Sequence, residues 1–346
     1  MPDEEPGTPA PTDGPPSIVA SADMIEPQPG EDSASTTVAL IDALEKLRKS
    51  RVLTYQTSPS ARIGEGIVGP LYDQLESIGD VEHLDLVLDT LGGNVEMPWR
   101  IVSLIREFCD RFSVLIPYRA ASAGTLLALG ADEIVMTRLA VLGPIDPSRG
   151  HPLLPVGPAG PVQATSVQDM RHAIKFIKQA GIDIVDDKFA YTPEAVAQLV
   201  GALFDNVHPL AIGALEQSYA LAKLAGTRCL ESHMTARGDK EKIQAIVDRL
   251  SDEYKSHGYQ IPRREAKSIG LKVKQPGKRV ENVLMALYRH FISRPVWPTQ
   301  QPPPGVPFKA HIAWLDSSDL NLRCEALFQL DAQGNLQPSG DGWAAY

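Results

Sequence analysis

The fold is decided by residues 84–137, which read LDLVLDTLGGNVEMPWRIVSLIREFCDRFSVLIPYRAASAGTLLALGADEIVMT. Three short apolar runs alternate here with two longer stretches of helical periodicity. In chain order these segments are 84–90, 97–111, 112–118, 122–131 and 132–137. Such alternation predicts parallel strands joined by helices. We therefore expect an α/β core whose sheet carries helices on both faces.

The pattern continues on both sides of this stretch. Toward the N-terminus it predicts a helix from about Ser35, a strand at 51–57 and a helix near 70–79. Toward the C-terminus it predicts mainly helices, at 166–179, 193–206, 209–225, 239–256, 262–269 and 280–293, the first announced by Ser166 and Asp169 at capping-box spacing. Near the end of the chain, the segments 311–315 and 325–337 are expected to form short strands around an Asp/Gly/Asn turn.

Composition divides the chain into four parts. Residues 1–34 are rich in Pro and acidic groups and predict a disordered tail. We expect the α/β core in 35–161, helices that complete the same domain in 162–295, and a Pro-rich linker followed by a β segment in 296–346.

Charge and composition argue against several classes of function. Lys and Arg total 33 against 43 Asp and Glu, a net charge of −10, which does not favour nucleic-acid binding. No N-terminal leader and no apolar run of about 18 residues is recognisable, so we expect a cytoplasmic protein without a membrane span. The three cysteines lack metal-ligand spacing and no GxGxxG fingerprint occurs, so neither a metal nor a cofactor is expected.

The segment ArgAlaAlaSerAlaGlyThr puts Ser122 where a strand gives way to a helix. The first N–H groups of a helix have no intrahelical partner, and the small neighbours Ala123 and Gly124 would let a substrate backbone approach. Two interpretations are open at this point. Ser122 is either a nucleophile beside an anion site or an N-cap residue.

Two glycines, Gly92 and Gly93, follow the preceding strand. The ends of neighbouring parallel strands open on the same edge of a sheet, where ligands bind. These glycines are therefore either an ordinary turn or a source of exposed backbone donors near Ser122.

The linked motifs resemble the Clp/crotonase superfamily, and within it the serine dehydrogenase proteinases, relatives of signal peptide peptidase A. The motifs are the strand before Gly-Gly, AlaSerAlaGlyThr, AlaAspGluIleValMet and LeuGlyProIleAspPro, with HisProLeuAlaIleGlyAla and SerHisGlyTyrGlnIleProArgArgGlu further on. The resemblance implies a repeated ββα core, with Ser122 as nucleophile. It also implies an oxyanion hole formed by the N–H of Gly92 or Gly93 and that of Ala123. Ala123-Gly124 departs from the Gly-Gly usual in signal peptide peptidases.

The general base is less clear than the nucleophile. Asp146 occupies roughly the position of the histidine in Clp peptidases, in a turn that we expect to line the site. Signal peptide peptidase A uses a lysine, for which Lys175 and Lys178 are candidates, and helical periodicity puts Lys178 nearer the apolar face. His257, at a predicted helix end, is the alternative, and His208, before the helix that starts at Pro209, is a further candidate.

The leading hypothesis is a serine endopeptidase that cleaves peptide or protein substrates and assembles into a homo-oligomer, as relatives commonly do. The alternative is a non-catalytic scaffold that binds a peptide or an acyl group, and an acyl-CoA enzyme is a third, disfavoured possibility. Apolar stripes at 209–225 could serve either an oligomer or the interior of one subunit.

Overall fold

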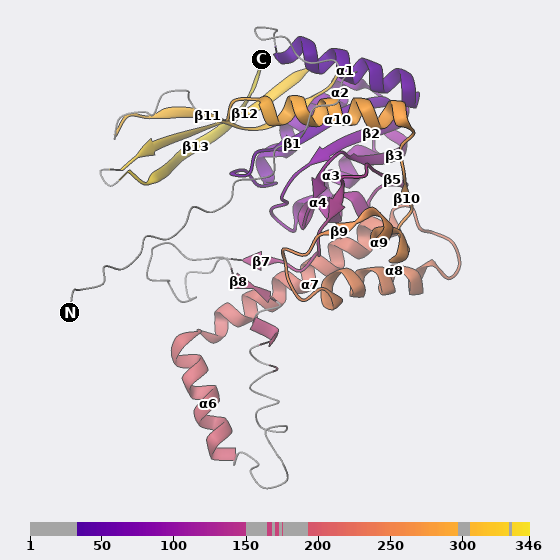
Figure 1. The fold of residues 1–346 in the computed structure, drawn as a ribbon. Helices are drawn as coiled ribbons and strands as arrows, with labels where there is room; N and C mark the ends of the chain where they lie inside the picture. The colour runs from indigo at the N-terminus through magenta and orange to yellow at the C-terminus, as the bar shows by residue number, and fades with distance from the viewer. Residues whose placement is uncertain are drawn as a thin grey trace, which may run out of the picture.

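The computed structural model describes residues 33–149, 165–167, 170–172, 175, 193–296, 305–331 and 334–346. Its central sheet has eight strands in the order β10, β5, β3, β2, β1, β11, β12, β13 (Figure 1). The strands are β1 (Arg51–Thr57), β2 (Val81–Asp89), β3 (Cys109–Ile116), β5 (Glu133–Met136), β10 (Val273–Lys274), β11 (Phe308–Asp316), β12 (Asn321–Leu330) and β13 (Leu336–Ala345). The first five are parallel, and β11–β13 continue the sheet in antiparallel order.

Helices cover both faces of the sheet. Side chains of α1 (Ser33–Arg48) and α10 (Lys278–Ser293) bury Val52, Val87 and Leu115 on one face. On the other face the core is formed with α2 (Val68–Ile78), α3 (Met97–Arg106) and α4 (Ala123–Leu129). Because alternate residues of each strand face opposite helical layers, β2 and β3 are buried over most of their length. The expectation of an α/β fold is confirmed.

The second half of the chain is mainly helical. It contains α6 (Pro193–Asn206), α7 (Pro209–Glu231), α8 (Asp239–Asp248) and α9 (Arg263–Ser268), with a π-helical turn at Arg249–Glu253. Part of the apolar stripe expected at 209–225 packs inside the chain, where Ala211 and Leu215 lie in one cluster with Val167, whereas Leu224 is 52% exposed. In Figure 1, α6 and the beginning of α7 extend away from the sheet.

Three expected elements differ in extent from the observed ones. The helix expected at 97–111 ends at Arg106, because Cys109 opens β3 and pairs with Val81. The helix expected from Ser166, by contrast, begins at Val167, directly after β8 (Thr165–Ser166), which pairs with β7 (Ser148–Arg149). The described residues that follow, Met170, Arg171, His172 and Lys175, are also helical. Near the C-terminus, β11 extends beyond the expected 311–315 to nine residues, and the segment 325–337 includes the end of β12 and the beginning of β13.

A small second sheet brings the site segments together. It joins β4 (Arg119–Ala120), β6 (Val141–Leu142) and β9 (Ile261–Pro262). A further bridge pairs Ala120 with Thr90, just after β2 ends. The segments before Ser122, after β2 and after residue 257 are thereby held at one edge of the main sheet.

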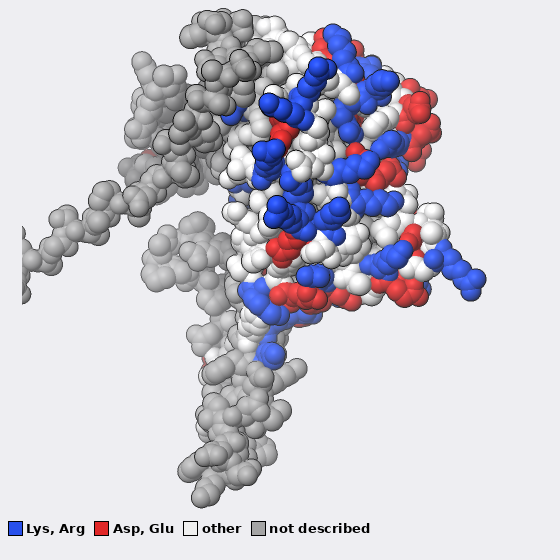
Figure 2. Space-filling view, turned by 45° about the vertical axis from the view of Figure 1, so that its right-hand side comes forward, with Lys and Arg blue, Asp and Glu red and all other residues white. Residues whose placement is uncertain are grey.

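Charges on the surface are of mixed sign. On the face shown in Figure 2, Lys and Arg side chains gather in the middle, with Asp and Glu among and beside them. Among the helices of the described residues, none is long and apolar enough to cross a membrane.

Candidate active site

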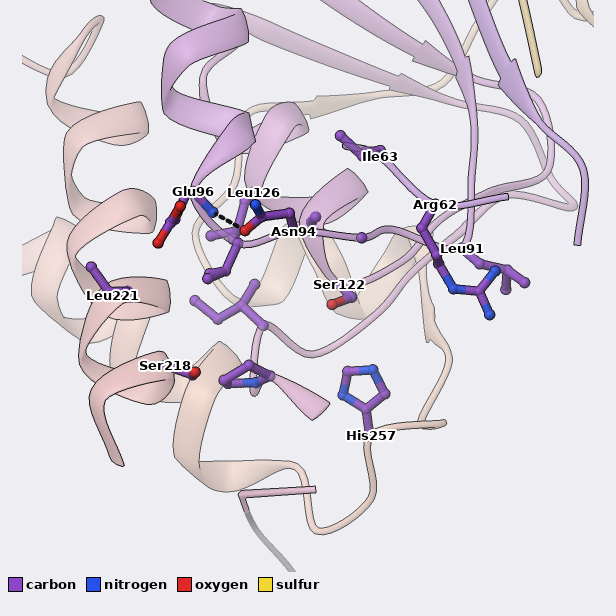
Figure 3. Close-up of a pocket in the computed structure, with 15 residues that line it drawn as sticks. Arg62, Ile63, Leu91, Asn94, Glu96, Ser122, Leu126, Ser218, Leu221 and His257 are labelled. Atoms are coloured by element: carbon purple, nitrogen blue, oxygen red, sulfur yellow. Dashed lines mark hydrogen bonds between the residues drawn. The ribbon is translucent and has the colours of Figure 1, made fainter. Parts of the chain in front are cut away.

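Ser122 has an unusual backbone conformation at the N-terminus of α4. Its φ of 52° and ψ of −116° lie in a region that L residues seldom occupy. Its side chain makes no capping hydrogen bond, so the N-cap interpretation does not describe the hydroxyl. Ser122 instead lines a cavity of about 780 Å³ (Figure 3).

Helix α4 is fixed by hydrogen bonds from its own buried threonine. The Thr125 hydroxyl donates to the Ala120 carbonyl at 2.8 Å and accepts from the Gly143 N–H at 3.0 Å. Every residue of α4 is buried. The strained serine is therefore held between a packed helix and the second sheet.

Gly92 and Gly93 both require the absence of a side chain, for different reasons. A Cβ on Gly92, whose φ is 97°, would lie 2.6 Å from the Ala121 carbonyl oxygen and 2.9 Å from the Ala123 nitrogen. A Cβ on Gly93 would lie 2.2 Å from the Ile63 carbonyl oxygen. The two glycines thus allow this turn to pack against both the serine segment and the Ile63 backbone.

The hydrogen bonds of this turn distinguish the two glycines as oxyanion donors. The Gly92 N–H donates to Thr90 Oγ1 at 3.1 Å. Within the described residues, the N–H groups of Gly93 and Ala123 have no acceptor, and both residues line the cavity with Ser122. Gly93 and Ala123 are therefore the pair available to stabilise an oxyanion.

A histidine and a buried aspartate complete the arrangement. His257 Nδ1 lies 3.3 Å from Asp146 Oδ1. The Asp146 side chain is fully buried, whereas that of His257 is 32% exposed and lines the cavity. In Figure 3 the imidazole lies beneath Ser122, and both side chains face the same cavity. Asp146 lies behind His257 and does not itself line the cavity.

The end of the α8 region determines the position of His257. The helix expected at 239–256 is α-helical only to Asp248 and ends with the π-helical turn, after which 254–260 form a loop. A backbone hydrogen bond of 3.0 Å from Ile145 N–H to the Leu250 carbonyl ties this turn to the Asp146 segment. Helix irregularities of this kind often occur at functional sites.

The other candidate bases lie elsewhere. Lys175 is exposed and does not line the cavity, and Lys178 lies outside the described residues. His208 caps α7, where its Nδ1 accepts from the Leu210 N–H at 3.1 Å. Of the candidate bases that the structure describes, only His257 lines the cavity of Ser122.

A second titratable carboxyl lies at the end of β2, away from the cavity. Burial raises the pKa of Asp89 to about 7, an effect that the nearby Arg119 guanidinium partly opposes. The Arg119 Nε and Asp89 Oδ1 atoms are 3.8 Å apart. Asp89 therefore changes charge near neutrality and contributes to the pH dependence of stability.

Comparison with known families finds a match in the middle of the chain. A profile of the ClpP-like SDH-type serine proteinases matches residues 74–187. That segment contains Ser122, the two glycines and Asp146, and it ends before His257.

Two uncharacterized proteins of Methanocaldococcus jannaschii are similar in sequence. One is 27% identical over 206 residues, which are 60% of this chain and 58% of the relative. The other is 29% identical over 145 residues, 39% of this chain and 50% of the relative. The chain thus spans about half the length of these relatives.

Two solved structures share a distant likeness. The ClpP protease catalytic domain from Plasmodium falciparum is 11% identical, with a TM-score of 0.35, over 68% of this chain and 92% of that chain. The membrane-bound stomatin-specific protease 1510-N is 18% identical, with a TM-score of 0.31, over 66% of this chain and 80% of that chain.

Proposed function

We propose that the protein hydrolyses peptide bonds, on the premise that residues 74–187 match the ClpP-like SDH-type serine proteinases. The nucleophile is Ser122 and the general base is His257. Asp146 holds the imidazole in place, and the N–H groups of Gly93 and Ala123 form the oxyanion hole.

The reaction follows from these positions. Ser122 Oγ attacks the scissile carbonyl carbon while His257 Nε2 takes the hydroxyl proton. Asp146 accepts a hydrogen bond from Nδ1, which fixes the tautomer and stabilises the imidazolium. The carbonyl oxygen becomes an oxyanion that accepts from Gly93 and Ala123.

Collapse of the tetrahedral intermediate breaks the peptide bond. His257 gives its proton to the leaving amine, and the acyl group stays on Ser122. Water then attacks the ester, with His257 again acting as base, and the free carboxylic acid leaves. Neither a metal nor a cofactor is needed for any of these steps.

One observation carries the proposal. An uncapped, strained serine, a cavity histidine bonded to a fully buried carboxyl group, and two N–H groups without acceptors in the described residues all meet at one cavity. A serine that served only as an N-cap would not require this arrangement.

Labelling with a fluorophosphonate probe tests the proposal directly. We expect the probe to modify Ser122, and we expect Ser122→Ala to abolish both labelling and peptide hydrolysis. Ser268→Ala is the matched control, because Ser268 is exposed on α9 and lies outside the cavity. Unlabelled, folded wild-type protein would favour the alternative of a non-catalytic peptide- or acyl-binding scaffold.

A further inference from the structure

Two charges of opposite sign lie at different sides of the active-site cavity. Besides His257, the ionisable side chains that line it are Arg62 and Glu96. In Figure 3 they lie on opposite sides of Ser122. Neither takes part in the proposed chemistry, so their presence needs another explanation.

Arg62 is held in place by its own loop. One amino group of its guanidinium donates to the carbonyls of Pro59 and Ala61, each at 2.8 Å. The next residue, Ile63, is bridged to Gly93 by hydrogen bonds on both sides, from Ile63 N–H to Gly92 O and from Asn94 N–H to Ile63 O. Arg62 is therefore fixed relative to the oxyanion hole.

The remaining donors of Arg62 are available for a ligand. In the part of the chain that the structure describes, no carboxylate lies within 4.0 Å of the guanidinium, and its Nε and second amino group make no hydrogen bond. A guanidinium binds a carboxylate through two parallel hydrogen bonds, a geometry that a fixed arginine can offer in advance.

Glu96 carries the negative charge on the side of the cavity opposite Arg62. The Asn94 side chain accepts a hydrogen bond from the Glu96 N–H at 3.0 Å, and the residue directly precedes α3. Its carboxylate has no basic partner among the described residues. Leu126 and Leu221 lie on the same side of Ser122 as Glu96 in Figure 3, so the Glu96 carboxylate lies next to apolar side chains.

We propose that Arg62 binds a carboxylate of the peptide substrate and that Glu96 favours a basic group at the other side of Ser122. This arrangement selects acid-bearing peptides and admits them in one direction across Ser122. The inference rests on the proposed function for the identity of the ligand as a peptide. The carboxylate is either an acidic side chain or the C-terminus of the substrate, which share the same chemistry.

A binding experiment in the Ser122→Ala background separates this inference from catalysis. Fluorescein-labelled peptides of one sequence would carry Glu or Gln at one position, each with a free or an amidated C-terminus, and anisotropy would measure Kd. We expect peptides with the recognised carboxylate to bind about tenfold more tightly than the neutral one. Arg62→Gln should remove that difference, while Arg237→Gln, at an exposed position outside the cavity, should preserve it.

The four peptides identify the source of the carboxylate. A preference for Glu with either terminus indicates a side chain, and a preference for the free terminus indicates the C-terminal carboxylate. Glu96→Gln should separately weaken binding of a peptide that carries Lys. Equal Kd values for all four peptides, or a preference unchanged by Arg62→Gln, would overturn the proposal whether or not Ser122 reacts with the fluorophosphonate.

Discussion

Replacement of Asp146 by Asn should strongly lower the rate of peptide hydrolysis while leaving the protein folded. The two side chains have nearly the same shape, so the buried position keeps its packing. Asn can, however, present its amide N–H₂ to Nδ1 of His257, which favours the tautomer with the proton on Nε2. That tautomer cannot accept the proton of Ser122.

The size of the effect follows from the hydrogen bond that is lost. In serine hydrolases with this arrangement, loss of the carboxylate costs up to about 10⁴-fold in kcat. The Nδ1 to Oδ1 distance of 3.3 Å is longer than the usual 2.7–3.2 Å, which indicates a weaker bond. We therefore expect a fall of about 10²-fold, equivalent to about 3 kcal/mol of transition-state stabilisation.

The assay is hydrolysis of a fluorogenic peptide at saturating substrate, with thermal unfolding recorded for each variant. Asp205→Asn, at an exposed position on α6, is the matched control and should be fully active. If Asp146→Asn keeps more than a third of wild-type kcat while His257→Gln is inactive, the aspartate does not orient the base and the reasoning is wrong.

Three other outcomes are expected. Gly93→Ala should lower kcat by about 10²- to 10³-fold, because the new Cβ would lie 2.2 Å from the Ile63 carbonyl oxygen and displace an oxyanion donor. Gly69→Ala is the control and should leave kcat unchanged, because no atom lies within 4 Å of its Cβ. An unchanged kcat in Gly93→Ala would show that the Gly93 N–H is not part of the oxyanion hole. Folded Asp89 has a pKa of about 7, above the unfolded value of 3.8, so between about pH 4 and 7 the folded state holds a proton that the unfolded chain has released. The free energy of unfolding should therefore fall as pH rises through this window, by at most about 1.4 kcal/mol per pH unit. In denaturant titrations, Asp89→Asn should show a smaller change of this free energy with pH. The same pH dependence in wild type and variant would contradict the prediction. Light scattering should give a mass above the 37.5 kDa of one chain, and a monomer at every concentration would disprove the expected homo-oligomer.

The elements of the core could be predicted because their sequence patterns are local. The strand at 51–57 and the helix at 193–206 have the predicted limits, since turn residues bound each apolar pattern. The prediction of a helix at 97–111 was wrong at its C-terminal end, because Phe108 and Cys109 continue an apolar pattern that fits either a helix or a strand. Only the pairing of Cys109 with Val81 decides for the strand.

The candidate nucleophile could also be proposed from the sequence, but the contact between Asp146 and His257 could not. Ser122 and its neighbours lie in one contiguous segment. Asp146 and His257 are 111 positions apart, and no spacing rule joins residues whose contact depends on the irregular end of α8. The motif around His257 was the available signal, and its link to Asp146 required the structure.

The position of β1 has a consequence for how the chain matures. β1 pairs with β2 on one side and on the other with β11, which begins at Phe308. Helix α1 likewise packs against α10, near the opposite end of the sequence. Such long-range contacts form slowly, because a large loop must close before they are gained. A nascent chain made as far as residue 257 already carries Ser122 and His257 but still lacks β11, so β1 keeps one unpaired edge until residues 308–316 have been added.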